Sequence, residues 1–310
     1  MQAPRAPRNR SPEEEDSAPS ADHQPKEPMD EEPTSSLASN TATHGDGEVD
    51  DSVTHEEASI READGQLIEL VVETKYYTPG PSDDPSDDGG LRKVWYKCSF
   101  NKRTGQKHGE YQEWWPNGQR WSKRHYKEGL LHGKEKWWHH NGHLGYEINW
   151  VEGKRHGESK EYFEDGKPLS LVTYKEGKYH GDVKRWMKSG QIDFHEQYVD
   201  GKLEGPRQEW HLGGKLFSLT HHHNGKKEGE GIWWFANGNM STKRQYHNGK
   251  KHGEKTSWYK KGGDQQCIKC IENYKDGKLH GECKYWDEYG LLTNHKIYED
   301  GFVRQDLLRR

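Results

Sequence analysis

The chain has 310 residues, of which only 28% are hydrophobic, and its mean hydropathy is −1.35. This composition excludes an ordinary globular core, and no run of about 18 apolar residues exists that would form a membrane-spanning helix. The net charge of −5 combines an acidic part, with 23 acidic and 6 basic residues in 1–90, and a basic remainder with 29 acidic and 41 basic residues.

The N-terminal segment 1–63 is rich in Pro, Ser, Asp and Glu and nearly lacks large apolar side chains. Such a segment buries too little surface to offset its ordering entropy, so we expect 1–63 to be a disordered acidic tail. The segment also lacks an apolar signal sequence, and the four cysteines fit a reducing compartment. We therefore expect an intracellular, cytoplasmic protein that is neither secreted nor transmembrane.

Residues 64–90 connect this tail to the rest of the chain. The apolar stretch GQLIELVVETKYYTPG at 65–80 predicts an additional strand that docks on the following domain. The sequence PSDDPSDDGG at 81–90 predicts an acidic linker.

Glycines recur at every 24th position through most of 91–305, which we interpret as one repeat domain. A first glycine is followed four residues later by a second, and nine residues after that by a third. The first glycines stand at 105, 129, 153, 177, 201, 225 and 249, and then, after a four-residue insertion, at 277 and 301. The period indicates about eight copies of one structural unit, followed by a short C-terminal tail at 306–310.

Each unit has the pattern of a β-hairpin. Segments such as EYQEWW end at PNG, HNG, EDG, KSG or ANG, which are hairpin signals because both turn positions need positive φ. We expect the Gly-x-x-x-Gly segment to be the loop between hairpins. Three glycines per unit and the absence of a 3.6-residue period argue against helices. The predicted fold is all-β: an elongated, single-layer antiparallel β-hairpin repeat array.

Aromatic residues stand five positions after the second glycine in all eight repeats. We predict that they form the structural core between repeats; a binding stripe is the alternative. They are Trp114, Trp138, Tyr162, Trp186, Trp210, Trp234, Trp258 and Trp286. A second aromatic row, mostly tyrosine, stands three positions before the next first glycine. Aliphatic residues such as Leu144 and Leu216 share its parity, so we expect them on the same face.

The repeat pattern in GKRHGESKEYFEDGK (153–167) and GKKHGEKTSWYKKGG (249–263) resembles the MORN repeat family. The likeness is to the degenerate variant of bacterial antitoxin-like proteins and marseillevirus-type giant viruses, since RQYHNGKKHGE lacks the preceding Trp of the fuller form. It covers about 100–301. The resemblance implies an elongated antiparallel β-array and a scaffold function, and a viral structural or factory-associated role is implied by this likeness alone.

Three repeats contain adjacent tryptophans, at 114–115, 137–138 and 233–234. Adjacent residues of a strand face opposite ways, so one member of each pair should lie off the core face. We predict that Trp115, Trp137 and Trp233 form an exposed surface that contacts a partner. Packing against the tail or a second layer is the alternative.

No metal or other cofactor is expected. A histidine precedes the second glycine in six repeats, and we interpret it as a turn residue bonded to local backbone, because copies about 9–10 Å apart cannot share one ion. Cys267, Cys270, His280 and Cys283 have a spacing compatible with zinc. This is a minor alternative, since Cys98 and Cys270 occupy the same place before a first glycine.

The sequence contains no Gly-rich phosphate loop, nucleophile motif or recurrent acid pair, so we do not expect an enzyme. We predict a non-catalytic scaffold that binds a protein partner. End-to-end self-association is open because the sheet should have free ends. Binding to anionic lipid through the basic hairpin face is the alternative, and nucleic acid is disfavoured because acidic residues alternate with the lysines.

Overall fold

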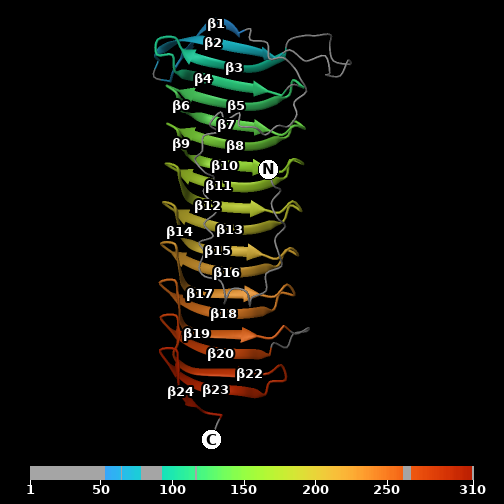
Figure 1. Ribbon diagram of the computed structural model, residues 1–310, viewed down its shortest axis with the longest axis vertical. Coiled ribbons are helices and arrows are strands. Elements are labelled where there is room, and N and C mark those ends of the chain that lie inside the picture. Colours follow the sequence, from blue (N-terminus) through green and yellow to red (C-terminus); the bar gives the residue numbers. More distant parts are fainter. Residues whose placement is uncertain (1–52, 64, 78–92, 116, 261–266, 309–310) are drawn as a thin grey trace.

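The computed structural model describes residues 53–63, 65–77, 93–115, 117–260 and 267–308. These residues form one antiparallel sheet of 24 strands in which neighbours in sequence are neighbours in space, so the strands lie across the long axis like rungs (Figure 1). The predicted all-β, single-layer array is confirmed. The tail up to residue 52 and the linker within 78–92 lie outside the described residues.

The strands fall into an N-terminal group and the repeats. The N-terminal group is β1 (Val53–Arg61), β2 (Leu67–Tyr77) and β3 (Lys93–Asn101). The first four repeats contain β4 (Lys107–Trp114), β5 (Arg120–Lys127), β6 (Leu130–Leu131), β7 (Gly133–Trp138), β8 (Leu144–Val151), β9 (Lys154–Arg155), β10 (Gly157–Tyr162), β11 (Pro168–Lys175), β12 (Lys178–Trp186) and β13 (Ile192–Val199). The last four contain β14 (Lys202–Leu203), β15 (Gly205–Trp210), β16 (Leu216–His223), β17 (Lys226–Trp234), β18 (Met240–His247), β19 (Lys250–Trp258), β20 (Ile268–Lys275), β21 (Lys278–Leu279), β22 (Gly281–Trp286), β23 (Leu292–Glu299) and β24 (Phe302–Asp306).

Strands β1 and β2 extend the sheet beyond β3 at its N-terminal end. The predicted docking strand exists as β2, which pairs with β3 and buries Ile68, Leu70 and Val72 on one face. Strand β1 lies inside the segment predicted to be disordered, which is a correction to the boundary at residue 63. All nine of its residues are exposed, yet its backbone pairs with β2 along its whole length. Amino-acid composition predicts only how much side-chain surface a segment can bury. It therefore does not predict an edge strand such as β1, which is held by backbone hydrogen bonds.

The tight turn of each hairpin differs from the prediction. At the third glycine only the glycine itself has positive φ, for example 80° at Gly142, whereas Asn141 before it does not. The N–H of Gly142 donates to His139 O at 2.9 Å, and the N–H of His143 donates to Asn141 Oδ1 at 3.0 Å. This is the three-residue loop in which a type I turn is followed by a left-handed residue.

Two consecutive residues with positive φ occur instead at the first glycine. Glu128 has φ of 48° and Gly129 has 80°, and the residues beside them, Lys127 and Leu130, pair directly. The same arrangement recurs in all eight repeats, with Glu, Asp or Asn before the glycine. The segment expected to be a loop is therefore a two-residue type I′ hairpin, whose twist matches that of the flanking strands.

A β-bulge in each repeat changes which side chains share a face. Positions are numbered as slots counted from the second glycine, so Trp210 occupies slot 5, Leu216 slot 11 and His222 slot 17 of one repeat. The register shifts between Glu209 and Trp210, and Trp210 pairs with Leu216. The aliphatic row in slot 11 therefore lies beside the aromatics in slot 5, and the predicted sharing of a face with slot 17 is wrong.

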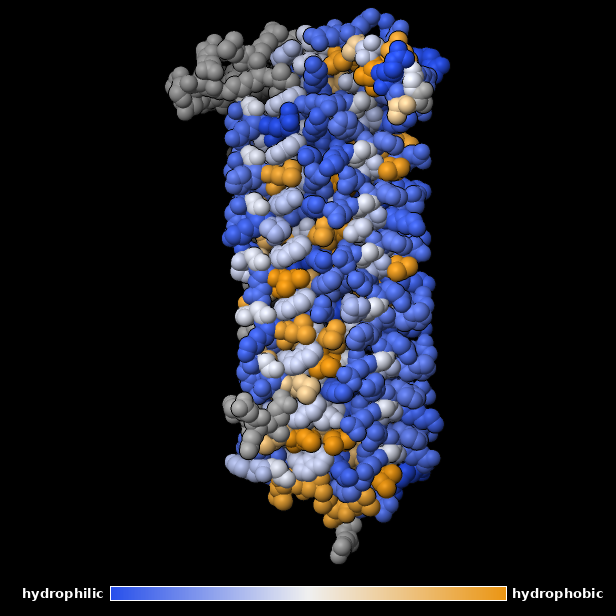
Figure 2. Space-filling model, turned by 180° about the vertical axis from the view of Figure 1, so that it is seen from behind, coloured by the Kyte–Doolittle hydropathy of each residue, from blue (hydrophilic) through white to orange (hydrophobic). Residues whose placement is uncertain are grey.

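The sheet thus has two unlike faces. The spine face carries slots 2, 4, 13, 15 and 17, which hold most of the buried side chains of the repeats. The outer face carries slots 1, 3, 5, 11, 14 and 16, and it is mostly hydrophilic (Figure 2). Pairs such as Gly205↔His222 and Ser218↔Trp233 continue the spine face within and between hairpins.

Candidate functional site

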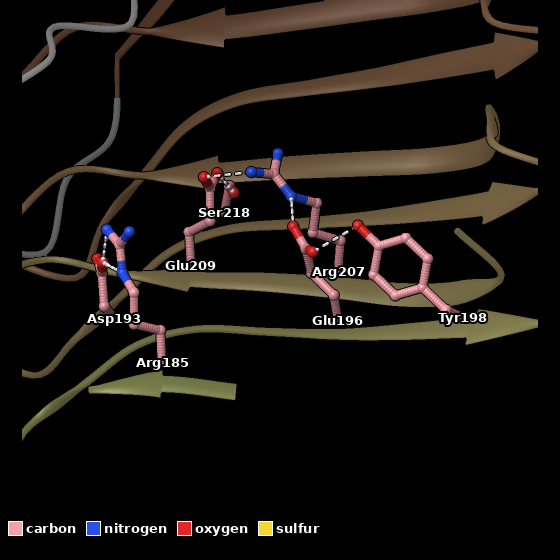
Figure 3. A network of polar contacts seen from close by, with 7 residues as sticks. All are labelled: Arg185, Asp193, Glu196, Tyr198, Arg207, Glu209 and Ser218. Atoms are coloured by element: carbon pink, nitrogen blue, oxygen red, sulfur yellow. Dashed lines mark hydrogen bonds and ion pairs between the residues drawn. The ribbon is translucent and has the colours of Figure 1, made fainter. Parts of the chain in front are cut away.

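The spine face is held together by buried charges as well as aromatic rings (Figure 3). Arg207 Nε lies 2.6 Å from Glu196 Oε1, and its Nη2 lies 2.9 Å from Glu209 Oε1. The Tyr198 hydroxyl donates to Glu196 at 2.9 Å, and the Ser218 hydroxyl donates to Glu209 at 2.7 Å. Burial alone would lower the pKa of Arg207, but Glu209 and Glu196 raise it above its ordinary value. The guanidinium is therefore paired on two sides in a low-dielectric site.

A similar network begins in the first repeat. Arg124 Nε donates to Glu135 at 3.1 Å, and Arg124 Nη1 lies 3.6 Å from Glu113. Glu135 also accepts hydrogen bonds from the Tyr146 hydroxyl at 3.1 Å and the Trp150 indole at 2.9 Å. Each buried carboxylate is thus surrounded by several donors, as a buried charge requires.

A third network lies near the C-terminal end. Lys255 Nζ lies 3.0 Å from Glu272, which also accepts from the Tyr274 and Tyr285 hydroxyls at 2.9 and 2.8 Å. Burial raises the pKa of Glu272, but Lys255 and the tyrosine donors outweigh it and the net direction is downward. These networks were not predicted from the sequence.

The predicted core aromatics occupy a different place. All eight side chains in slot 5 are half-buried, and none is in the buried set, because the buried face is the opposite one. Two of the rings contact the return strand of the preceding repeat: the Arg120 guanidinium is 5.5 Å from the Trp138 ring, and Trp234, Leu216 and Lys215 line a depression of about 380 Å³.

These rings and the side chains in slot 11 form a stripe along the side of the three-residue turns. Figure 2 shows pale and orange side chains gathered along this side of the outer face, on the left. We call this the aromatic stripe, and it consists of the eight aromatics in slot 5 with Leu144, Pro168, Ile192, Leu216, Met240 and Leu292.

The predicted exposed tryptophans do not form an exposed surface. Trp233 is only 3% exposed and lies on the spine face, where its ring is 6.4 Å from that of Tyr246. Trp137 is half-buried on the same face and stacks on Tyr146 at 5.9 Å. Trp137 and Trp233 occupy slot 4, which belongs to the buried spine face, whereas the tryptophan after each occupies slot 5 on the outer face. The prediction from strand alternation therefore assigned the two members of each pair to the wrong faces.

Trp115 stands just before the turn of its hairpin, in slot 6. It is half-buried, and its ring stacks on His140 of the next repeat with centroids 3.7 Å apart. Its indole N–H is buried and has no hydrogen-bond partner among the described residues. The three tryptophans are therefore not brought together on one surface.

The histidine row joins successive turns. His180 Nδ1 lies 3.4 Å from the N–H of Asp200, one repeat further along, and 3.2 Å from its carboxylate. Where glutamate replaces the histidine, at Glu204, asparagine replaces the acid, and the N–H of Asn224 donates to Glu204 at 2.8 Å. That backbone bond, followed by a bond from His223, lowers the pKa of Glu204. Where the predicted backbone bond exists, as at His180, it is between repeats rather than local, and Nδ1 of His132 and of His156 makes no hydrogen bond to the described residues.

The four residues of the zinc alternative are not gathered into a site. Cys270 and Cys283 are buried on the spine face, and burial raises the pKa of both thiols. Cys267 is half-buried before β20, and His280 Nδ1 accepts the N–H of Asp300 at 3.5 Å. Among the described residues no group of three or more His, Cys, Asp or Glu is placed to hold a metal ion.

An open sheet built from one regularly recurring hairpin unit defines a β-hairpin repeat protein. The family model described as MORN repeat variant matches four of these units, at 107–128, 131–152, 155–176 and 227–248. Four of its units are therefore MORN repeats of the variant type. This class suggests a repeat-based binding or scaffold protein, since such repeats are generally interaction modules.

No curated protein matches the chain, and the family match does not bear on the bacterial or viral part of the resemblance. In the part of the chain that the structure describes, no helix is long and apolar enough to cross a membrane.

Proposed function

We propose that this protein is a non-catalytic scaffold whose aromatic stripe binds an extended segment of a protein partner. The observation that carries the proposal is that the same half-exposed ring recurs in all eight repeats along one side of a single sheet. Trp and Tyr supply much of the binding energy at protein interfaces because they bury a large area with few rotatable bonds. A preformed row of rings also avoids the cost of ordering the surface on binding.

The spacing of the stripe favours a particular kind of segment. Two strands separate equivalent rings, which places them about 9–10 Å apart along the array. A polyproline II helix advances about 9.3 Å in each three-residue turn. A segment with proline at every third residue would therefore present one proline to each ring, in the manner in which aromatic grooves bind proline-rich peptides.

The outer face supports a protein partner more than a lipid surface. Several of its lysines are paired with carboxylates, such as Lys136 with Glu147 at 2.8 Å and Lys243 with Glu230 at 2.7 Å. Such pairs reduce the positive potential that would attract anionic headgroups.

Fluorescence anisotropy of a labelled peptide with proline at every third residue tests the proposal. Binding should survive high salt and be lost in a Trp186→Leu/Trp210→Leu/Trp234→Leu variant that remains folded by circular dichroism. A peptide of the same composition with proline at every fourth residue should bind more weakly.

The matched control is Lys178→Ser/Lys202→Ser, which changes exposed lysines beside the type I′ turns and should leave peptide binding intact. Binding only to vesicles with anionic lipid, released by salt, lost in the lysine variant and unaffected by the tryptophan changes would refute the proposal in favour of the lipid alternative.

End-to-end association of copies stays a prediction. The last repeat exposes large apolar side chains, with Tyr289 86%, Leu291 68% and Phe302 73% exposed. Light scattering over a wide concentration range measures this directly: a molar mass that rises with concentration supports association, and a constant monomer mass excludes it.

A further inference from the structure

The charged spine is interrupted in the third repeat. Between the networks of Arg124 and Arg207, slots 2 and 15 hold four small or apolar residues in succession: Ile148, Ser159, Val172 and Val183. No long side chain of the described residues fills the middle of the spine face there. A cavity of about 220 Å³ results, which is more than ten times the roughly 10–15 Å³ that one water molecule needs.

The cavity contains polar groups without partners among the described residues. Ser159 is 7% exposed, and its hydroxyl makes no hydrogen bond to them. The Nε of Arg155 is also buried and unpaired within the same part of the chain. Unpaired polar groups at such depth are rare in folded proteins, and they indicate a place where a ligand can supply the missing bonds.

Arg155 differs from two other arginines of the spine face, Arg124 and Arg207. Arg124 and Arg207 each have two carboxylates within 4.0 Å, whereas Arg155 has none from the residues that the structure describes. Its guanidinium lies 5.5 Å from the rings of both Trp150 and Tyr174, and its Nη1 donates to the Tyr174 hydroxyl at 3.2 Å. The guanidinium is therefore held in position but lacks an anionic partner there.

We propose that this cavity binds a carboxylate carried on a short apolar stem. The carboxylate accepts hydrogen bonds from Arg155 and the Ser159 hydroxyl, and the stem lies over Ile148 and Val172. An arginine and a carboxylate form strong, directional hydrogen bonds of this kind. Glu161 also lines the cavity and accepts a bond from Ser170 at 3.0 Å, so its negative charge requires the ligand to carry a single carboxylate that lies towards Arg155 and away from Glu161. The site is on the spine face and does not depend on the aromatic stripe.

Ligand-observed saturation-transfer NMR with phenylpropionate, and with its uncharged amide, tests the site on the full chain. The acid should bind with a dissociation constant near or below ~1 mM and the amide at least about tenfold more weakly. Arg155→Met should abolish the difference between them. The matched control Arg120→Met removes another arginine that lies over a tryptophan ring, Trp138, on the outer face, and it should leave binding unchanged.

A second variant separates loss of the site from loss of folding. Ser159→Leu fills the cavity from its floor and leaves Arg155 in place, so it should remove binding while the thermal midpoint is kept or raised. Equal binding of acid and amide to the wild type, or wild-type affinity in Arg155→Met, would overturn the proposal.

The carboxylate can come from a free small acid or from the C-terminus of a peptide, and two further probes distinguish them. One is a tripeptide with an acetylated N-terminus and a free C-terminal leucine, and the other is its amidated form. Tighter binding of the free-acid peptide than of phenylpropionate identifies a peptide terminus as the ligand class. Weaker binding of the peptide identifies a small carboxylate.

Discussion

Gly145 shows how a single residue without a side chain can be required by its neighbour. A Cβ at this position would lie 2.0 Å from Cε3 of Trp137, so alanine cannot fit unless the indole moves. Its φ is not positive, so the requirement comes from the close contact with the ring and not from backbone conformation. Gly231 has the same relation to Trp233, with a nearest approach of 2.8 Å. Both glycines stand outside the periodic glycine pattern, which is the signal that could have revealed the tryptophans of the spine face.

We predict that Gly145→Ala lowers the free energy of unfolding by about 1–3 kcal/mol, the usual cost of overpacking. The matched control is Gly213→Ala, since a Cβ on Gly213 would have no described atom within 4 Å and the residue has no positive φ. The control should be neutral or stabilise by ~0.4–1 kcal/mol. Urea denaturation of both variants measures the difference, and an equal effect at the two sites would contradict the steric explanation.

His222 occupies the slot that holds tyrosine in most repeats. Burial, then the nearby charges of Lys227 and Arg207, lower its pKa to about 4, and its Nδ1 has no hydrogen-bond partner in the described part of the chain. A pKa below the unfolded value of 6.5 means that the folded state binds fewer protons. The contribution of neutral His222 to stability is therefore present above pH 6.5 and is lost as the pH falls towards 4, by up to ~3 kcal/mol.

We predict that His222→Tyr stabilises the protein and flattens its stability profile between pH 6.5 and 4 relative to the wild type. His221→Gln is the control, because this exposed neighbour stands in a slot where Gln197 and Gln245 already occur. Thermal denaturation at several pH values measures both. A parallel profile in His222→Tyr and the wild type would show that His222 is not the source of the pH dependence.

At the scale of the turn, the residue before the second glycine and the residue that bonds to it one repeat later vary together. A histidine before the second glycine is followed one repeat later by Asp or Glu, as in His180 and Asp200, whereas Glu204 and Glu228 are followed by Asn224 and Asn248. In these pairs the first side chain accepts the backbone N–H of the second residue. Complementarity between neighbouring turns is thus maintained along the array.

We predict that Asn224→Asp lowers the thermal midpoint, because its carboxylate would face Glu204. The double variant Glu204→His/Asn224→Asp recreates the pair seen at positions 180 and 200 and should recover most of the loss. Differential scanning calorimetry of the two single variants and the double variant gives the coupling. Additive effects would show that the turns do not interact through these residues.

The hairpin elements were predictable because glycine reports backbone conformation directly. The regular glycines mark every turn, and β2 was identified by its apolar, β-branched composition. The division of side chains between the two faces was not predictable. The bulge before Trp210 does not change the length of the repeat, so nothing in the sequence marks it, yet it changes which residues of the return strand lie on each face. The buried Glu196 and its half-buried partner Arg207 were missed for a related reason: charged residues are normally assigned to the surface.

At the scale of the whole molecule, the strands of each repeat pair only with neighbouring strands in the part of the chain that the structure describes, so units should be removable if the new contacts are compatible. We predict that deletion of Gly157–His180 gives a folded chain that is shorter by roughly 9–10 Å. The deletion joins His156 to a repeat that supplies Asp200, and it brings Ile148 against Val183 on the spine face. Small-angle scattering measures the length and urea denaturation the stability.

Deletion of Gly205–Glu228 is the matched control for this prediction. It also removes one full repeat and preserves the turn pairing, because Glu204 then precedes the repeat that contains Asn248. It removes Arg207, however, and leaves the buried Glu196 without its cation, which should cost about 3–5 kcal/mol. Equal stability of the two deletions would show that the ion network does not hold the repeats together.

The single sheet with its strands across the long axis also determines how the molecule responds to force. Tension applied between the two ends acts along the hydrogen bonds between strands, because these run parallel to the long axis (Figure 1). The hydrogen bonds of one strand pair are then loaded and broken one after another, and not all at once as in shear. Under load the array should therefore extend hairpin by hairpin at low force and shorten again by the same steps when the load is released.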